Sequence, residues 1–350
     1  MVVSTVAMGN AGSAPDDDWI AAYDVGMVTR ALGTSGLVVS AVGLGCMPMS
    51  DVYGATDVQE AVATLELAVD LGVTFWDTAE VYGQGGNEEL IARVLARHRD
   101  DVIIATKFGF APDRSLDGRP ENARAAIDRS LQRLGTDHVD LWYLHRVDTA
   151  VPIEETVGAM GEAVSAGKAR YLGLSEASAA TLRRACAVHP ITALQSEWSL
   201  WTRDIEAEVL AAARELGVGI VPYSPLGRGL FTGRLPGVDA LDESDYRRSA
   251  PRFTEGNLEV NRQLVDRLVE YAAGVGCTPG QLAIAWVLAQ GDDVVPIPGT
   301  KRRLYLEENA AAVDVRLTPG QVDDVGSIFA DVAGARYAQE HVYGDSPLPG

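Results

Sequence analysis

The residues FWDTAEVYG span positions 75–83, and their strand-like beginning ends in Asp77, a few positions before Tyr82. Two further apolar runs end in the same way, VIIAT before Lys107 and VDLWYL before His145. Apolar, β-branched runs of this length are typical of strands buried on both faces, as in a parallel sheet. In a parallel barrel the polar residues at the C-terminal strand ends face one site, so these four side chains can converge.

The pattern of these runs continues along the chain. From Val42 onward, short apolar runs alternate with amphipathic stretches, as in repeated βα units. Strands are expected at 42–45, 74–77, 102–107, 139–145, 169–175, 193–197, 219–223 and 294–297. Helices are expected near 58–72, 87–98, 121–134, 153–166, 178–187, 205–216, 278–290 and 302–312. Eight right-handed units close into a (β/α)8 TIM barrel, which is the α/β fold class we predict.

The chain is longer than such a barrel requires. The additions we expect are a hairpin at 28–39 and extra helices near 260–274 and 318–329. Residues 226–260 are rich in Gly, Arg, Asp and Ser without clear periodicity, and a loop this long is usually functional or disordered. The predicted organisation is a flexible extension at 1–26, a single barrel domain at 27–335 and a C-terminal tail at 336–350.

Composition excludes several classes of partner. The net charge of −20 repels nucleic acid and anionic membrane surfaces over most of the exterior. No segment is apolar for long enough to span a bilayer, and the first 26 residues do not have the pattern of a signal peptide. Three scattered cysteines, Cys46, Cys186 and Cys277, are too few for a disulfide framework or a zinc knuckle. We therefore predict a cytoplasmic protein without a metal site.

The four strand-end residues suit the reduction of a carbonyl, which needs a general acid beside a hydride source. A tyrosine can act as that acid if its pKa falls toward the working pH, and a nearby ammonium such as Lys107 lowers it. Asp77 can pair with Lys107, and His145 can orient the substrate oxygen. Taken singly, Asp77 could be a helix cap, Lys107 a structural or Schiff-base lysine and His145 an interior histidine.

A nucleotide site of the doubly wound kind is not indicated, because GLGCMP at 43–48 lacks the third glycine and opens no helix. PGTKRR at 298–303 offers another place, at the end of a strand and the start of a helix. Backbone N–H groups at a helix N-terminus attract phosphate, and three adjacent cations reinforce them. We predict phosphate binding there, although a basic triplet can also be solvated surface.

With these residues in view, the chain resembles the aldo-keto reductases from about Thr29 to Val325. The resemblance rests on motifs in family order: DTAEVYG at 77–83, TKFG at 106–109, LHRVD at 144–148, LSEAS at 174–178, LQSEWSLW at 194–201, VPYSPLGRG at 221–229 and IPGTKRR at 297–303. The chain is most similar to the bacterial, plant and fungal branch that includes perakine reductase, auxin-induced-protein-like reductases and pyridoxal reductases. The resemblance implies that Tyr82 is the proton donor and that Asp77, Lys107 and His145 assist it.

The resemblance also implies which residues bind the cofactor. Ser175 and Gln195 are expected to bond the nicotinamide carboxamide, and Tyr223 to stack on its ring. The remaining implied contacts are Ser224, Leu226 and Gly229 for the pyrophosphate, Gly299, Thr300, Lys301 and Arg302 for the 2′-phosphate, and Glu308 and Asn309 for the adenine. This set implies NADPH over NADH. The chain departs from the family at Glu176, where an asparagine is common, and at Tyr305, where many relatives place an arginine.

The substrate is expected to be a small aldehyde or ketone. Candidate pocket linings are Met47, Met49, Tyr53 and Trp142, and for each of them ordinary packing is as good an interpretation. Two other functions remain open at this point: a barrel lyase that uses Lys107 as a Schiff base, and a cofactor-sensing regulatory subunit of the same fold. Neither the physiological substrate nor the oligomeric state follows from the sequence.

Overall fold

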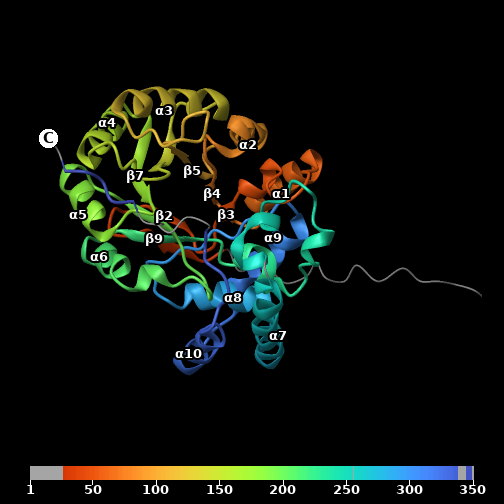
Figure 1. The fold of residues 1–350 in the computed structure, drawn as a ribbon. Coiled ribbons are helices and arrows are strands. Elements are labelled where there is room, and N and C mark those ends of the chain that lie inside the picture. Colours follow the sequence, from red (N-terminus) through yellow and green to blue (C-terminus); the bar gives the residue numbers. More distant parts are fainter. Residues whose placement is uncertain (1–26, 255, 338–343, 349–350) are drawn as a thin grey trace, which may run out of the picture.

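The computed structural model describes residues 27–254, 256–337 and 344–348. The predicted extension at 1–26 lies outside the described residues. A ring of helices surrounds the strands, and α7 (Asn257–Val275) and α10 (Pro319–Ile328) project from one side of it (Figure 1). Among the helices within the described ranges, none is long and apolar enough to cross a membrane.

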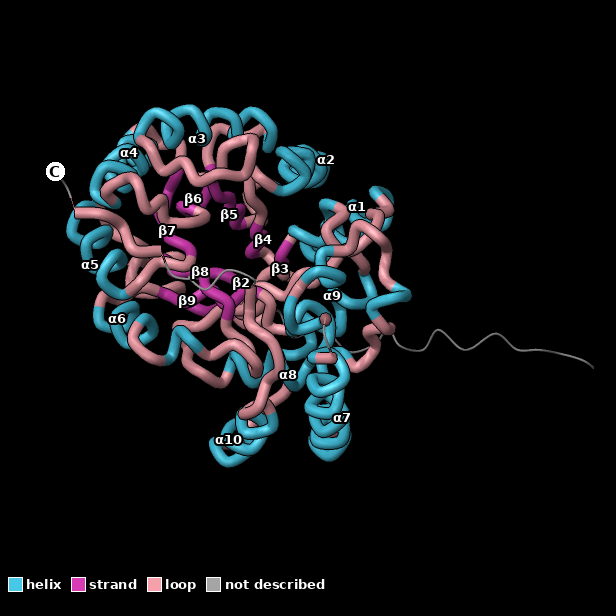
Figure 2. The backbone as a smooth tube through the Cα atoms, in the orientation of Figure 1, coloured by secondary structure: helices cyan, strands magenta, loops and turns pink. Residues whose placement is uncertain are grey.

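The central sheet consists of parallel strands, each hydrogen-bonded to the next along the chain. They are β3 (Leu44–Gly45), β4 (Phe75–Asp77), β5 (Ile103–Phe108), β6 (Val139–Leu144), β7 (Ala169–Ser175), β8 (Ala193–Glu197) and β9 (Gly219–Tyr223). Figure 2 shows these strands curving around the inside of the helical ring. Parallel neighbours joined in sequence order require a crossover between each pair, so the predicted βα repeat is confirmed.

Residues 294–299 close the barrel between β9 and β3 through isolated parallel bridges. Amides of this segment donate to β9 carbonyls at 2.8 and 3.0 Å. On the other side, Gly43 and Gly45 donate to the carbonyls of Pro296 and Pro298 at 2.9 and 3.2 Å. Because prolines have no N–H with which to return these bonds, the predicted eighth strand closes the barrel without a continuous ladder.

Eight helices pack around the barrel between successive strands. They are α1 (Val58–Asp70), α2 (Gly86–His98), α3 (Pro120–Leu134), α4 (Ile153–Ser165), α5 (Ala179–Val188), α6 (Val209–Glu215), α8 (Pro279–Leu288) and α9 (Arg303–Ala310). The tetrapeptide TPGQ occurs at 278–281 and 318–321 and starts α8 and α10 with the same capping box. The helix predicted at 205–216 is shorter, because the backbone of Glu208 leaves helical geometry with φ −139° and ψ −38°.

The predicted hairpin forms from β1 (Thr29–Ala31) and β2 (Val38–Ser40). Its buried side chains, Leu32, Leu37 and Val39, join the cluster that fills the barrel interior. The turn at Gly33 fits against the backbone of Gly217 and Gly219, just before and at the start of β9. The hairpin therefore plugs the N-terminal end of the barrel and leaves the C-terminal end open for a site.

Two chain segments border that open end. The long segment after β9 folds as short 3-10 turns, η4 (Gly227–Thr232), η5 (Val238–Ala240), η6 (Tyr246–Ser249) and η7 (Pro251–Phe253), rather than as an unstructured loop. Its Tyr246 amide donates to the carbonyl of Val52, 3.2 Å away, on the loop after β3. Near the C-terminus, Ser346 accepts a hydrogen bond from the first amide of α4 at 2.5 Å. The described end of the predicted tail is therefore anchored on the rim.

Candidate active site

The site residues follow from the alternation of side chains along the barrel strands. Interior side chains alternate with side chains that pack against the helices. Interior positions near the strand ends are Phe75, Ala105, Tyr143, Ala193 and Val221. Two residues further along the same strands lie, in the same order, Asp77, Lys107, His145, Gln195 and Tyr223. These polar residues continue the interior face at the C-terminal opening.

The four predicted catalytic residues lie together at this opening. The Lys107 ammonium is fully buried, forms an ion pair with Asp77 and donates to the carbonyl of Thr78 at 2.7 Å. It also donates to the Tyr82 hydroxyl at 3.4 Å. The rings of Tyr82 and His145 meet edge to face, with centroids 5.7 Å apart and an interplanar angle of 86°. A phenol, an ammonium and an imidazole thus share one small polar site.

The phenol of Tyr82 is held in its protonated form. Burial raises the pKa of Tyr82, and the opposing effect of the Lys107 ammonium does not bring it down to its ordinary value. The pKa of Tyr82 is thus raised, whereas the sequence analysis expected Lys107 to lower it. On burial a phenolate loses more solvation free energy than it gains from the attraction of the single ammonium 3.4 Å away. The Tyr82 hydroxyl therefore carries its proton at neutral pH.

The two buried partners of the ion pair have pKa values shifted by opposing effects. Burial raises the pKa of Asp77 despite the nearby Lys107 ammonium. Burial lowers the pKa of Lys107, but Asp77 and Tyr82 raise it above its ordinary value overall. We assign a charged pair, because the Asp77 carboxylate also accepts a bond from Gln195 Nε2 at 2.7 Å.

The imidazole of His145 is neutral at pH 7. Burial, followed by the positive charges of Arg146 and Lys107, lowers the pKa of His145 well below its ordinary value. The His145 amide donates to the Phe108 carbonyl at 2.8 Å, and the Phe110 ring lies edge-on at a centroid distance of 5.0 Å. These contacts fix the ring beside Tyr82, where a neutral imidazole can donate one N–H.

A cavity of about 920 Å³ extends from this site along the C-terminal end of the barrel. Asp77, Tyr82 and His145 border one part of it. The predicted cofactor residues that border it are Gln195, Tyr223, Ser224, Leu226, Gly229, Gly299, Thr300, Lys301, Arg302, Glu308 and Asn309. Ser175 is fully buried and outside this lining, and its hydroxyl accepts a hydrogen bond from Arg146 Nη1 at 3.0 Å.

The basic triplet at the far end of the cavity divides into three roles. The Lys301 ammonium donates to the backbone carbonyls of Tyr53, Gly54 and Ala55 at 3.3, 2.7 and 2.8 Å. Arg302 is exposed and lies over the Tyr305 ring, with its guanidinium carbon 5.8 Å from the centroid. Arg303 instead pairs with Glu60 on α1 at 2.9 Å. Two of the three cations thus face the cavity, at the N-terminus of α9.

The predicted substrate-lining residues fall into two groups. Met47 and Tyr53 border the cavity, together with Val81 and Phe110. Met49 and Trp142 do not border it, because both are buried in the core between barrel and helices. Trp142 stacks on Phe108 at a centroid distance of 4.5 Å. Trp142 is the neighbour of Tyr143 on β6, and neighbouring side chains of a strand point to opposite faces of the sheet. Because Tyr143 faces the barrel interior, Trp142 faces the helices.

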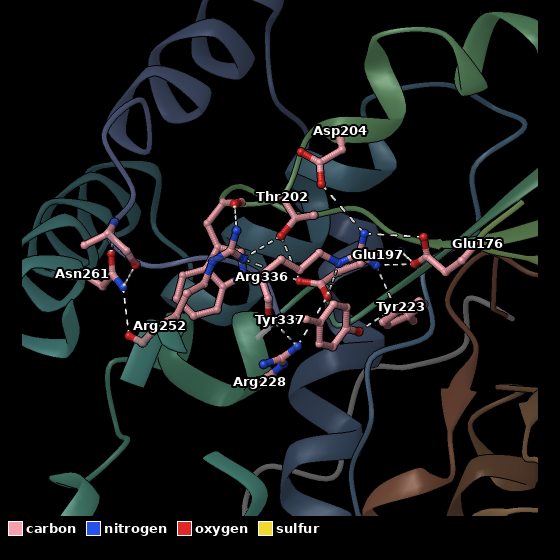
Figure 3. Close-up of polar contacts among 12 residues, drawn as sticks. Glu176, Glu197, Thr202, Asp204, Tyr223, Arg228, Arg252, Asn261, Arg336 and Tyr337 are labelled. Atoms are coloured by element: carbon pink, nitrogen blue, oxygen red, sulfur yellow. Dashed lines mark hydrogen bonds and ion pairs between the residues drawn. The ribbon is translucent and has the colours of Figure 1, made fainter. Parts of the chain in front are cut away.

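A buried charge cluster, which was not predicted from the sequence, lies behind the site near Tyr223 (Figure 3). Arg336 pairs with Glu176 and with Glu197, the second at 2.9 Å, and also donates to the Tyr223 hydroxyl at 2.8 Å. The Tyr337 hydroxyl lies 2.9 Å from the Tyr223 hydroxyl. Residues 336 and 337 therefore belong to the wall of the site, although they were predicted as the start of a tail. A possible signal was the pair of acidic residues at the ends of β7 and β8, since buried carboxylates need cations.

Several side chains at the cavity fit a nucleotide cofactor. Buried Asn309 Nδ2 and Arg228 Nη1 have no hydrogen-bond partner within the described part of the chain, as a ligand-binding group would. Ser224 and Arg228 hold left-handed backbones, with φ 53° and 57°, and strain of this kind gathers at ligand-binding loops. The Tyr223 ring, the polar loop after it and the cations of the α9 end suit an extended ligand with a flat ring and phosphates.

Comparison with known proteins agrees with this geometry. A sequence model described as the aldo/keto reductase family matches residues 41–329. A protein of Glycine max named probable aldo-keto reductase 1 is 47% identical over 314 residues, which cover 87% of this chain and 90% of that protein.

Solved structures give the same picture. The glycerol dehydrogenase AKR11B4 from Gluconobacter oxydans superposes with a TM-score of 0.79 at 28% identity, over 86% of this chain and 95% of that one. The thermostable aldo-keto reductase Tm1743, solved with the inhibitor epalrestat, gives a TM-score of 0.69 at 30% identity, over 86% and 100% of the two chains. Oxidoreductases of this kind act on carbonyl compounds with nicotinamide cofactors. The chain belongs to the aldo/keto reductase family.

Proposed function

We propose that the protein reduces aldehydes or ketones to alcohols with NADPH and that Tyr82 donates the proton. The observation that carries the proposal is the position of the Tyr82 hydroxyl, 3.4 Å from Lys107 Nζ and beside His145, at the border of the large cavity. The cavity provides room for a cofactor and a substrate together, since ligand sites commonly measure about 300–1,000 Å³.

The residues divide the work of proton transfer. A bound reduced nicotinamide supplies the hydride that reaches the carbonyl carbon. Tyr82 gives its hydroxyl proton to the carbonyl oxygen, and His145 donates a hydrogen bond that holds this oxygen in place. As charge develops on the phenol oxygen, the Lys107 ammonium stabilises it, while Asp77 keeps that ammonium charged and in position.

The preference for NADPH rests on Lys301 and Arg302. Neither side chain has a carboxylate within 4.0 Å among the residues that the structure describes. Their charges are therefore available to a 2′-phosphate, next to the N-terminal amides of α9. The exposed position of Arg302 permits a bidentate contact with phosphate oxygens.

The geometry disfavours the Schiff-base alternative. Lys107 is fully buried, and its ammonium is paired and raised in pKa, whereas an amine nucleophile must lose its proton. The regulatory-subunit alternative shares the fold and differs only in the absence of turnover.

A small carbonyl compound is the proposed partner, and three free cysteines support a reducing cytoplasm as the location.

Steady-state assays with a panel of aldehydes and ketones test the proposal. NADPH oxidation is followed by absorbance for the native protein and for Tyr82→Phe, with NADH in parallel. We expect turnover with NADPH, and a loss of roughly 10²–10⁴-fold in kcat for Tyr82→Phe with NADPH binding retained. Undiminished turnover in Tyr82→Phe would overturn the assignment of the proton donor. Tight NADPH binding with no turnover across the panel would instead favour the regulatory subunit.

A further inference from the structure

Glu176 stands at a position where an asparagine is common in the family, and it cannot donate a hydrogen bond as an asparagine amide can. A carboxylate has no N–H to donate to a carboxamide oxygen. The Glu176 side chain also points away from the cavity, toward Arg336 (Figure 3). Its Oε1 further accepts the Glu197 amide at 2.9 Å, and its backbone is left-handed with φ 53°. A hydrogen bond to the oxygen of a nicotinamide carboxamide next to Ser175 therefore needs another donor.

Arg146 lies where such a donor is needed. It follows His145 at the end of β6 and borders the cavity. Its Nη1 donates to Ser175 Oγ at 3.0 Å and to the His145 carbonyl at 2.6 Å, and its Nη2 donates to the Tyr223 hydroxyl at 3.3 Å. Ser175 and Tyr223 are the residues expected to contact the nicotinamide amide and ring. The guanidinium thus lies between the two expected nicotinamide contacts.

We propose that Arg146 is a cofactor-contacting residue that donates to the nicotinamide carboxamide oxygen. The proposal rests on the proposed function, since it requires a nicotinamide beside Tyr223. An arginine fork has five N–H groups, so Arg146 can keep its bonds to Ser175 and the His145 carbonyl and still donate to the ligand. Arg336 supports this arrangement by holding Glu176 out of the way.

The charge of Arg146 has a consequence that a neutral amide would not have. Among the described residues, Lys107 is paired with Asp77, and Arg336 with Glu176 and Glu197, whereas Arg146 has no carboxylate within 4.0 Å. An oxidised nicotinamide ring carries a positive charge, and a reduced ring is neutral. The uncompensated cation therefore disfavours NADP+ relative to NADPH at this end of the cavity. The enzyme is biased toward binding the reduced cofactor and releasing the oxidised one.

Calorimetric titration of NADPH and of NADP+ tests the proposal on the native protein, Arg146→Met and Arg146→Lys. We expect Arg146→Met to weaken NADPH binding by about tenfold or more, because a charge-assisted hydrogen bond is lost. We expect it to weaken NADP+ binding less, so that the ratio of Kd for NADP+ to Kd for NADPH falls by roughly fivefold. Arg146→Lys keeps the charge and is expected to keep the native ratio while weakening both cofactors.

Arg93→Met is the matched control, since it removes one positive charge from the exposed face of α2, and Arg93 does not border the cavity. Unchanged Kd values in Arg146→Met would refute the proposal. So would a rise in KM confined to carboxylate-bearing aldehydes with native cofactor binding, because Arg146 would then contact substrate. If Arg146→Met does not fold, a changed ratio in Arg146→Lys would refute the proposal. Failure of the native protein to bind either cofactor would instead sink the proposed function itself.

Discussion

Replacing Arg336 by methionine tests the charge cluster behind Tyr223, because this residue joins two buried carboxylates. The side chains of Glu176, Glu197 and Arg336 are 0%, 1% and 5% exposed. Glu197 keeps Arg228 and Arg252 as partners, each at 3.7 Å, whereas the Glu176 carboxylate keeps only the hydrogen bond from the Glu197 amide. Breaking a buried pair by removing one partner costs about 3–5 kcal/mol, so we expect a loss of that size near neutral pH.

The pH dependence separates lost charge pairing from lost packing. Burial raises the pKa of Glu197, but Arg336, Arg228 and Arg252 hold it below its ordinary value in the native protein. Stability from a depressed carboxyl pKa is present above the unfolded pKa and is lost only as pH falls through the folded one. Without Arg336, the largest charge effect that lowers the pKa of Glu197 is lost, so the variant has less stability to lose as the pH falls. The difference in stability between the native protein and the variant is therefore largest above the unfolded pKa of about 4.3 and shrinks between about pH 7.5 and about pH 4.

Guanidinium unfolding followed by tryptophan fluorescence measures this difference at both pH values. We expect the destabilisation of Arg336→Met to shrink by about 1 kcal/mol or more from pH 7.5 to pH 4. The control Arg336→Lys retains a positive charge, and we expect a smaller loss with little pH dependence. An equal loss for Arg336→Met at both pH values, or a loss below about 1 kcal/mol, would show that the cluster does not carry the charge pairing described here.

The remaining predictions concern the catalytic residues and the cofactor. Lys107→Met is expected to lower kcat by roughly 10²-fold or more and to lower the melting temperature, because Asp77 is left buried without its cation; unchanged values of both would contradict the ion-pair assignment. Because the pKa of Tyr82 is raised, the rate of reduction should stay level from neutral pH to about pH 10 and fall only above it; a decline that begins near pH 7 would contradict the donor's protonation state. Arg302→Met should raise the Kd for NADPH about tenfold and leave that for NADH unchanged in the same titrations, because the exposed guanidinium can bond phosphate oxygens; equal effects on both would contradict a 2′-phosphate contact. Gly299→Ala should lower stability, since the added methyl carbon would lie 2.8 Å from the ring of Pro48; a native melting curve would contradict the tight closure at this point.

Much of the site could be predicted from local patterns in the sequence. Strand ends are marked by β-branched runs followed by polar residues, and alternation with a period of two aligns those residues with the barrel interior. Asp77, Lys107 and His145 could be predicted to converge for this reason, and Tyr82 follows in the turn directly after its strand. The same logic places Gln195 and Tyr223 at the opening. The same alternation along β6 also places Trp142 on the outer face of the barrel, where it lies in the structure.

Contacts between distant segments were beyond such reasoning. Arg336 meets Glu176 across 160 positions, and no local period relates the C-terminal segment to the end of β7. The Lys301 ammonium donates three hydrogen bonds to carbonyls 246 to 248 positions away in the chain. The basic triplet in the sequence does not reveal these contacts. The net pKa of Tyr82 depends on how completely the surrounding chain excludes water, and burial is a property of the whole fold.

The sequence by itself determined the barrel, the strand ends and the polar residues that gather at them, because each of these depends on short-range periodicity and on residue type. Only the tertiary structure decided that Glu176 faces Arg336, that Arg146 lies between Ser175 and Tyr223, and that the phenol stays protonated. Those features arise from desolvation and from pairing between charges far apart in the chain, which act only once the barrel has closed.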